Sequence, residues 1–357
     1  MLKALRLTSI LCFAFLASGA ARAQPDHVDI TWLSIANVHF DLGRAQILAD
    51  GYVTRLPQDL FFGGGGGFAE TRRPMHSDEA AVREVFDALG GKRGVNLLLA
   101  GHSHWDHTFD SATWARLSGA RLMGPATACL QLRAQRIPRA RCKPVVGGEA
   151  IELAPGVRMW VIRWNHSGTH AQNPEQHDPI ELEAIPKPDA SGALRAGVAE
   201  DFPNGGGTRA YLFRVDGSGG TFSWLYQDSA GASDLSAPIV IGGHDFGAPL
   251  DNLRRALAAA RLDSVDLWIA TGGADVASLV LPVAKPKAYL PVHWDGLFAP
   301  FKPGPAAPFA DARLSAMLAA ERVTLVVPAG YADKWRLDPS GIRPLDNSTV
   351  KKALGLE

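Results

Sequence analysis

The hydrophobic positions of this chain divide it into short buried strands and amphipathic helices. The segment Val95-Asn96-Leu97-Leu98-Leu99-Ala100 is a nearly continuous apolar run, which is typical of a strand buried on both faces. Positions 81, 82, 85, 86 and 89 are apolar at helical spacing, and Ser77 stands where a helix cap is expected. Strand-like and helix-like segments alternate in this way along the chain, which predicts an α/β fold.

The same patterns predict the remaining elements in two stretches that each begin with strands and continue into helices. We expect strands at 28–35, 38–41, 45–49, 121–123, 157–164, 209–215, 221–227, 265–270, 288–292 and 323–327. Helices are expected at 250–261, 274–284 and 309–321, and another after Asp110 and Ser111, which are good capping residues. The polar stretch 338–357 is predicted to be a loosely attached tail.

The strongest chemical signal is the sequence Gly-His-Ser-His-Trp-Asp-His at 101–107, directly after the apolar run. Imidazole nitrogens and carboxylates are the ligands that borderline divalent ions such as zinc prefer. His102 and His104 are two positions apart on an extended chain, so they point to the same side and can share one ion. Asp106 and His107 lie beyond a turn and would face a second ion. The alternative is a surface loop that is rich in histidine by chance.

This His-x-His-x-Asp-His pattern after a buried strand resembles the signature of the metallo-β-lactamase superfamily. That family also has an Asp that ends an early strand, a third His for the first ion, a bridging Asp, and a last His for the second ion. In this chain Asp50, His166, Asp228 and His293 match these positions in the expected order. The sequence around His293 is similar to the branch that includes L-ascorbate-6-phosphate lactonase and N-acyl-phosphatidylethanolamine phospholipase D.

The resemblance implies a single-domain, four-layered αββα sandwich that holds two zinc ions, or other divalent ions, at the edge between two sheets. It implies that His102, His104 and His166 hold the first ion, that Asp106, His107 and His293 hold the second, and that Asp228 bridges them. Asp50 would orient the metal loop, and Asp106 could also move a proton to the leaving group, so these two are the candidate catalytic residues. Two ions that share one water lower its pKa, and the resulting hydroxide can attack a carbonyl carbon or a phosphorus.

The first 23 residues predict export. Lys3 and Arg6 precede the apolar stretch 7–17, and Ala21-Arg22-Ala23 is a cleavage site of small residues. These are the three parts of a secretory signal peptide, and the stretch is too short for a permanent membrane anchor. We therefore expect a secreted domain at 24–337, periplasmic in a Gram-negative host.

Cysteine content and overall charge bear on the state of the thiols and on the class of ligand. Cys129 and Cys142 remain after cleavage of the signal peptide, and they could form a disulfide in an oxidising compartment or remain separate buried thiols. Lys and Arg together number 36, as do Asp and Glu, so the totals give no sign of nucleic-acid binding. We expect a small-molecule substrate, and the sequence does not predict an oligomeric state.

Two insertions and one histidine are candidates for substrate contacts. Phe62 and Phe68 flank five glycines, an arrangement that could form a mobile flap over a partly apolar substrate or could be a plain flexible linker. The polar stretch 171–207 is long for an ordinary connection, so it either covers the site or is disordered decoration. His244 lies on a glycine-rich turn, where it could contact substrate or simply be a surface or core histidine.

These observations predict an exported zinc-dependent hydrolase that opens a carboxylic ester, lactone or β-lactam. Attack on a carbonyl needs no dedicated phosphate clamp, and the paired cations Arg72 and Arg73 are the only such pair near the glycine-rich loop. Phosphodiester hydrolysis on the same metal core is the alternative, followed by a metal-binding protein without catalysis.

Overall fold

The computed structural model of the protein describes residues 24–57, 73–171, 174–197 and 200–357. The expected signal peptide and the two flanking aromatic residues of the glycine-rich loop, Phe62 and Phe68, lie outside the described residues. Within the described part of the chain, no helix is both long and apolar enough to cross a membrane.

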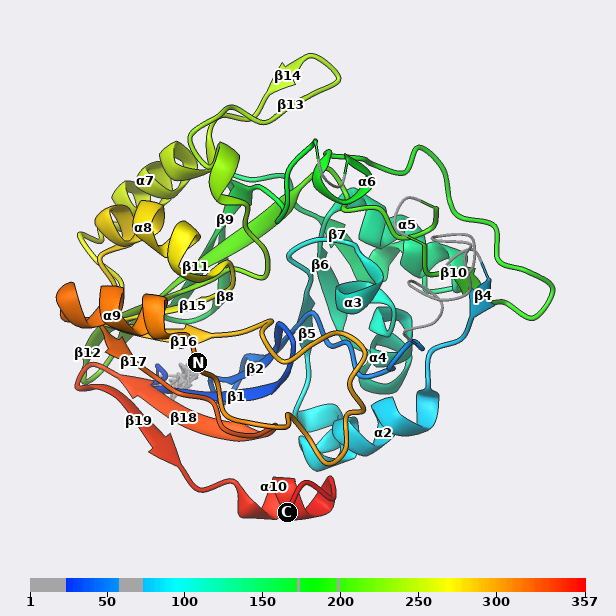
Figure 1. Cartoon of the computed structure of the whole chain (residues 1–357). Helices are drawn as coiled ribbons and strands as arrows, with labels where there is room; N and C mark the ends of the chain where they lie inside the picture. Colours follow the sequence, from blue (N-terminus) through cyan, green and yellow to red (C-terminus); the bar gives the residue numbers. More distant parts are fainter. Residues whose placement is uncertain (1–23, 58–72, 172–173, 198–199) are drawn as a thin grey trace, which may run out of the picture.

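Two large mixed sheets form the centre of the molecule (Figure 1). The strands of the first sheet are β1 (Val28–Ser34), β2 (Asn37–Asp41), β3 (Gln46–Ala49), β5 (Leu97–Leu99), β6 (Arg121–Gly124), β7 (Cys142–Pro144), β18 (Asp333–Asp338) and β19 (Gly341–Leu345). Those of the second are β8 (Ala150–Ala154), β9 (Val157–Trp164), β11 (Thr208–Gly217), β12 (Gly220–Tyr226), β15 (Leu267–Ala270), β16 (Ala288–Pro291) and β17 (Thr324–Leu325). Their spatial orders are β19-β18-β1-β2-β3-β5-β6-β7 and β17-β16-β15-β12-β11-β9-β8.

α-Helices, three short 3-10 helices and two small two-stranded sheets complete the described structure. The helices are α2 (Glu79–Ala88), α3 (Trp105–Thr108), α4 (Ser111–Ser118), α5 (Ala126–Ala134), α6 (Pro174–His177), α7 (Pro249–Ala260), α8 (Gly273–Ala284), α9 (Ala312–Ala320) and α10 (Ser348–Ala353). The short strand β4 (Pro74–Met75) pairs with β10 (Leu194–Arg195), and β13 (Val240–Ile241) pairs with β14 (His244–Asp245).

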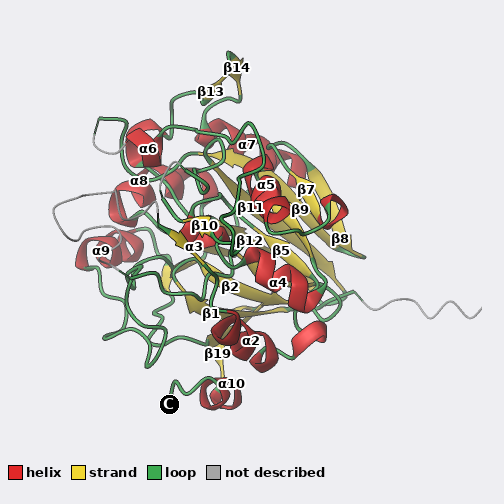
Figure 2. Ribbon diagram, turned by 90° about the vertical axis from the view of Figure 1, so that its right-hand side faces the viewer, coloured by secondary structure: helices red, strands yellow, loops and turns green. Residues whose placement is uncertain are grey.

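The alternation of side chains along β9 shows how the layers form. Met159 and Val161 belong to a core between the two sheets, whereas Trp160 and Ile162 belong to a second core beneath α7, α8 and α9. Across the first core, the ring of Phe40 on β2 lies 5.8 Å from the ring of Phe213 on β11. Helices α4 and α5 contact β6 on the outer side of the first sheet, and α2 packs on α4 (Figures 1 and 2). The predicted αββα sandwich is therefore confirmed.

The strand directions gather the candidate site residues at one edge of the sandwich. In the first sheet β3, β5, β6 and β7 run parallel, and in the second sheet β12, β15, β16 and β17 do so. Asp50 follows the end of β3, and residues 101–107 follow β5. Asp228 follows β12, and His293 follows β16. Loops at the carboxyl ends of parallel strands form binding sites in open α/β sheets, which explains why these side chains meet.

The segment after Asp338 differs from the sequence-based expectation of a loose tail. Strand β19 pairs with β18, which in turn pairs with β1, so the segment completes the first sheet. Leu354, the C-cap residue of α10, is fully buried. Arg343 and Pro344 on β19 suit an edge strand, because a charge and a proline hinder pairing with a further strand, so the polar composition of the segment was misleading here.

The sequence predicted Ser77 as the N-cap of α2, and this prediction is wrong. Asp78 is the N-cap, and its carboxylate accepts a hydrogen bond from the Ala81 amide. Ser77 instead donates its hydroxyl to Asp110, at 2.6 Å. The buried Asp110 carboxylate also accepts bonds from the Val53 amide, the Thr54 amide and the Thr54 hydroxyl. Asp110 thus fixes the segment that follows Asp50, rather than capping α4 with its side chain.

Candidate metal centre

The loop after β5 brings four of the candidate ligands into the interior. His104 keeps an extended backbone, with φ −63° and ψ 159°, and directly precedes the single turn of helix α3. Asp106 and His107 lie on that turn, and all four side chains are buried, including His102 at the start of the loop. The sequence pattern predicted only the later helix α4, because a four-residue helix is too short to show apolar periodicity.

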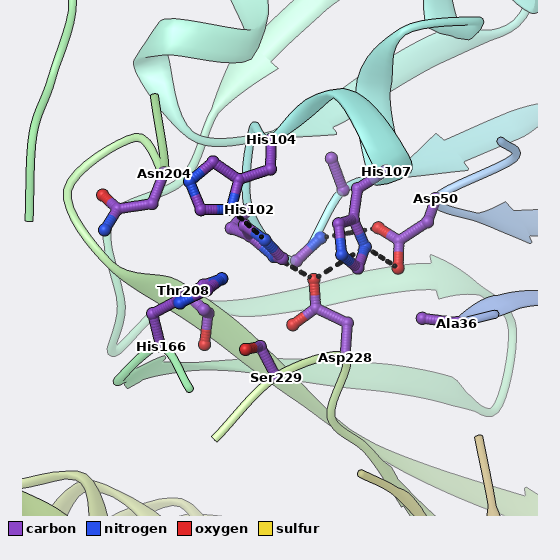
Figure 3. A network of polar contacts seen from close by, with 12 residues as sticks. Ala36, Asp50, His102, His104, His107, His166, Asn204, Thr208, Asp228 and Ser229 are labelled. Carbon is purple, nitrogen blue, oxygen red and sulfur yellow. Dashed lines mark hydrogen bonds and ion pairs between the residues drawn. The ribbon is translucent and has the colours of Figure 1, made fainter. Parts of the chain in front are cut away.

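The seven candidate ligands form three overlapping groups. In each group the ligand atoms lie within 4.8 Å of one another, and the groups are His102–His104–His166, Asp106–His107–His293 and His102–His107–Asp228. The first two groups coincide with the two ion sites that the resemblance implies. Asp228 joins one histidine of each group, and Figure 3 shows its carboxylate between the rings of His102 and His107.

The donor atoms in this cluster fit divalent metal ions. Nε2 of His104 and Oδ1 of Asp228 are buried and have no hydrogen-bond partner among the described residues, although buried polar atoms are almost always paired. His102 Nε2 and His104 Nδ1 face each other at 3.1 Å. Two nitrogens on one tetrahedral zinc with bonds of about 2.0–2.1 Å would lie roughly 3.3 Å apart. Histidine and carboxylate donors arranged in this way are suited to zinc or a similar ion.

Burial keeps the three histidines of the first group neutral. Loss of solvent, assisted by neighbouring imidazoles, holds the pKa of His102 and the pKa of His166 well below the usual range. Burial also lowers the pKa of His104 to about 4. A metal ligand must offer a lone pair rather than a proton, so these shifts favour the form that binds a cation.

Charged neighbours dominate the second group. Burial alone would lower the pKa of His107, but Asp106 and Asp50 outweigh it and raise that pKa well above the usual range. Burial would likewise raise the pKa of Asp106, yet His107 and His293 lower it well below its ordinary value. Burial, reinforced by Asp50, raises the pKa of Asp228. Three carboxylates are thus crowded around imidazoles inside the protein, which is the charge pattern that a bound cation would balance.

Asp50 holds the metal loop from behind. Its Oδ1 accepts a hydrogen bond from the Gly101 amide at 3.1 Å, and its Oδ2 lies 3.0 Å from His107 Nδ1. The hydroxyl of Tyr226 donates to the same Oδ2 at 2.5 Å. This side chain therefore fixes both the beginning of the loop and the orientation of the His107 ring, as partners of metal-binding histidines commonly do.

Backbone strain marks two of the site residues. Asp50 has φ 61° and His293 has φ 63°, a left-handed conformation that is unusual for residues other than glycine. The His293 amide donates to the carbonyl of Ile35 at 2.9 Å, which holds this turn against the loop between β1 and β2. Strained residues of this kind cluster at functional sites, because the turn aims the side chain.

Gly101 permits the close approach of Asp228. A Cβ atom built on Gly101 would overlap the Asp228 carboxylate, with Oδ1 at only 2.5 Å. The φ angle of Gly101 is not in the left-handed region, so the requirement for glycine here is steric. Sequence reasoning treated this residue only as the start of the motif.

The long stretch 171–207 lies against the metal loop in its described parts and is not disordered decoration there. The Ser103 amide donates to the carbonyl of Asn204 at 3.3 Å. Gln131 of α5 donates its amide to the carbonyls of Ser103 and Asp201, at 2.8 and 3.0 Å. Gln131 also accepts a bond from the Thr108 hydroxyl, so one buried amide ties the loop, α3 and the insertion together. A single glutamine on a predicted helix gave no sequence signal for this role.

His244, a candidate substrate contact, is not brought to the cluster. It lies exposed on the β13–β14 hairpin, which projects from the body of the molecule, and its ring packs against that of Phe246 at 4.4 Å (Figures 1 and 2).

The two cysteines, whose state the sequence left open, are paired. Cys129 on α5 and Cys142 at the start of β7 form a disulfide. The bond joins the helix that carries Gln131 to the edge strand of the first sheet.

Comparisons with known proteins give distant likenesses. No protein-family model matches the sequence, and no curated protein matches it. Among solved structures, the chain is similar to Igni18, a metallo hydrolase from Ignicoccus hospitalis, at 13% identity and a TM-score of 0.49, covering 87% of this chain and 99% of that one. It is also similar to a possible metal-dependent hydrolase from Veillonella parvula, at 14% identity and a TM-score of 0.48, covering 86% and 98% of the two chains. The metallo-β-lactamase SMB-1 is similar at 16% identity and a TM-score of 0.33, covering 69% and 76%.

These TM-scores are too low to transfer a function from any of the three proteins. The chemistry of this chain has to be inferred from the geometry of the metal cluster itself.

Proposed function

We propose that the protein is an exported, dinuclear zinc-dependent hydrolase that opens an ester, lactone or β-lactam. The observation that carries the proposal is the arrangement of seven side chains as two histidine-containing triads joined by Asp228. Bound there, two divalent ions would supply a Lewis acid and lower the pKa of water at the site. His102, His104 and His166 would hold one ion, and Asp106, His107 and His293 the other.

The surrounding residues support this chemistry in two ways. Asp50 and Tyr226 form a buried pair that keeps His107 in one orientation, so the site is pre-organised before substrate arrives. Asp106 lies within 3.2 Å of both His107 and His293, and its carboxylate is placed to carry a proton between the site and a leaving group. The disulfide is consistent with the proposed export, because such bonds persist in oxidising compartments.

Metal content gives the first test. Elemental analysis of the purified mature protein should find close to two zinc ions per chain. His104→Ala should lose mainly one ion, and Asp228→Ala should weaken both sites because this carboxylate joins them. His244→Ala is the matched control, since it removes an exposed histidine from the projecting hairpin and should leave the content unchanged. One ion or none in the wild-type protein would contradict the dinuclear proposal.

Turnover gives the second test. Lactones, carboxylic esters and β-lactams should be compared with bis(p-nitrophenyl) phosphate as substrates of the wild-type protein and of Asp106→Asn. Asp245→Asn, on the exposed hairpin, is the control. We expect acyl hydrolysis that falls sharply in Asp106→Asn alone. Strong phosphodiesterase activity that is lost in this variant, without acyl hydrolysis, would instead assign the phosphodiesterase function. No turnover with a full metal complement would favour a metal-binding protein without catalysis.

A further inference from the structure

Arg55 places a cation in an aromatic cluster beside the candidate metal centre. Its guanidinium carbon lies 5.3 Å from the centroid of the Tyr52 ring, 5.8 Å from that of Phe301 and 6.0 Å from that of Tyr331. Distances of this size allow cation–π attraction, which is worth roughly 0.5–2 kcal/mol for one ring. The rings hold the charged group in place, but they cannot accept its five N–H hydrogen bonds.

The polar atoms of Arg55 are poorly satisfied by the described residues. Its Nε, Nη1 and Nη2 atoms are all buried, and none has a well-aligned hydrogen bond with a described residue, although the Tyr331 hydroxyl makes a looser polar contact with the guanidinium. Within the same part of the chain, no carboxylate forms an ion pair with this residue. A buried guanidinium without an anion or hydrogen-bond acceptors is costly, so such groups are normally paired.

A nearby carboxylate, Asp295, is already engaged with other donors. It accepts the amide of Ile35 at 3.0 Å and the hydroxyl of Tyr331 at 2.6 Å. These bonds hold the turn that carries His293, two residues earlier in the chain. Burial and Asp295 raise the pKa of Tyr331 despite the opposing charge of Arg55, so this hydroxyl stays a neutral donor to Asp295. Most of the five N–H donors of Arg55 are therefore left for a different acceptor.

The position of Arg55 connects it to the metal centre through neighbouring rings. The Tyr52 ring packs edge-on against Trp105 at 5.4 Å, and Trp105 stands between His104 and Asp106 in the metal loop. The ring of Phe298, on the segment after His293, lies 5.7 Å from that of Trp105. Arg55 thus lies where the segment that follows Asp50 meets the segment that follows His293.

We propose that Arg55 binds a free carboxylate on the substrate, separate from the bond that is cleaved. The proposal rests on the hydrolase function above and specifies its substrate class as an apolar, carboxylate-bearing molecule. A guanidinium matches the planar, two-oxygen geometry of a carboxylate and can donate two parallel hydrogen bonds to it. Phe298, which is only partly buried beside Trp105, offers an apolar contact for the rest of the molecule. Because Asp295 is occupied by other donors, the substrate carboxylate would complete the hydrogen bonding of Arg55.

Binding of a simple probe tests this role without turnover. We would titrate phenylacetate and its neutral analogue phenylacetamide into the purified protein by isothermal calorimetry, with metal content measured on the same sample. The wild-type protein should bind phenylacetate at least tenfold more tightly than phenylacetamide. Arg55→Met should lose this preference while retaining its metal, and Arg55→Lys should keep only part of it, since an ammonium cannot form the two parallel bonds. Arg158→Met is the matched control, because Arg158 also lies over an aromatic ring, Trp160, but on an exposed position of β9.

The possible outcomes of these titrations test the carboxylate site at Arg55 separately from the proposed hydrolase function. Equal binding of phenylacetate to the wild type and Arg55→Met would show that the carboxylate binds elsewhere, for example at a metal ion, and would overturn the proposal. Absence of any preference in the wild type would do the same. If Arg55→Met fails to fold, as thermal unfolding would reveal, the comparison between the wild type and Arg55→Lys decides. A protein that prefers phenylacetate through Arg55 but hydrolyses no ester or lactone would contradict the hydrolase function and leave the carboxylate site intact.

Discussion

Replacing Gly101 with alanine should empty the proposed metal centre by steric means alone. The new Cβ would lie 2.5 Å from Asp228 Oδ1, whereas real Cβ contacts are essentially never shorter than 3.0 Å. The carboxylate must therefore move by more than 0.5 Å, because its Oδ2 and Cγ atoms would lie even nearer to the new Cβ than Oδ1, and by more than 0.9 Å to reach an ordinary contact of 3.4 Å. Metal–ligand distances tolerate only about 0.2 Å of deviation, so a movement of this size removes Asp228 as a ligand. It also disrupts the 2.7 Å contact between Asp228 and His102.

The expected result is a fall in affinity for both ions, since Asp228 contacts one histidine of each group. Loss of even an outer partner of a metal ligand typically weakens binding about 10–100-fold, and loss of the ligand itself should cost at least as much. The assay is elemental analysis after dialysis against a weak chelator, together with thermal unfolding with and without added zinc. The wild-type protein should be stabilised by zinc, and Gly101→Ala should lose most of this stabilisation.

Two other glycines provide controls for this experiment. Gly219 has an ordinary φ and open space around the position of a Cβ, so Gly219→Ala should change neither metal content nor stability. Gly94 also has an ordinary φ, but its Cβ would overlap the carbonyl of Leu89 in the turn after α2. Gly94→Ala should therefore lower stability while the folded protein keeps its metal. A Gly101→Ala protein that retains two ions with wild-type affinity would refute the reasoning, because it would show that Asp228 does not need its present position.

Three further predictions concern the stability of the fold. Changing Cys129 and Cys142 to serine should lower the free energy of unfolding by about 3 kcal/mol in the chain-entropy model, as measured by denaturant titration; an unchanged free energy would contradict this. Asp110→Ala should cost about 3–5 kcal/mol in the same assay, because four hydrogen-bond donors lose their buried acceptor; a loss below about 1 kcal/mol would show that water replaces it. The hydrogen bond to Asp234 raises the pKa of His177 above its ordinary value of 6.5, so its stabilising contribution is fully present below pH 6.5 and is lost as the pH rises through the raised pKa. His177→Ala should flatten this part of the stability–pH curve, and a curve identical to that of the wild type would rule out the assignment.

The sequence was most informative where the chemistry restricts residue type. His102, His104, Asp106 and His107 could be singled out because few functions other than metal binding require this combination of side chains. Strands such as β9 could be placed because both faces of its middle part are buried, which leaves the apolar run 159–162. The αββα layering came from the family resemblance, and the alternating cores on either side of β9 confirm it.

The remaining features depend on contacts between distant parts of the chain. Gln131 joins Ser103 and Asp201, 28 and 70 positions away along the chain, and nothing near Gln131 in the sequence indicates this. Arg55 looks like an ordinary surface arginine until the rings of Phe301 and Tyr331 are placed around it. The local sequence predicted the wrong N-cap for α2. In the folded chain the Ser77 hydroxyl donates to Asp110 instead of capping the helix, and the sequence near Ser77 does not indicate this contact.

The pairing of β1 with β18 has a consequence for how the chain folds. The first strand after residue 24 has β2 on one side and, on the other, a strand that begins at Asp333. During synthesis, one edge of β1 therefore stays open until residues 333–338 have been made, and closing it brings together residues about 300 positions apart. Such non-local pairing slows folding, so the chain stays unfolded for longer. A slowly folding chain would suit the proposed export, if the protein crosses the membrane unfolded. The same feature makes truncation hazardous, because a chain that ends before residue 333 would expose the hydrogen-bonding edge of an apolar strand and invite aggregation.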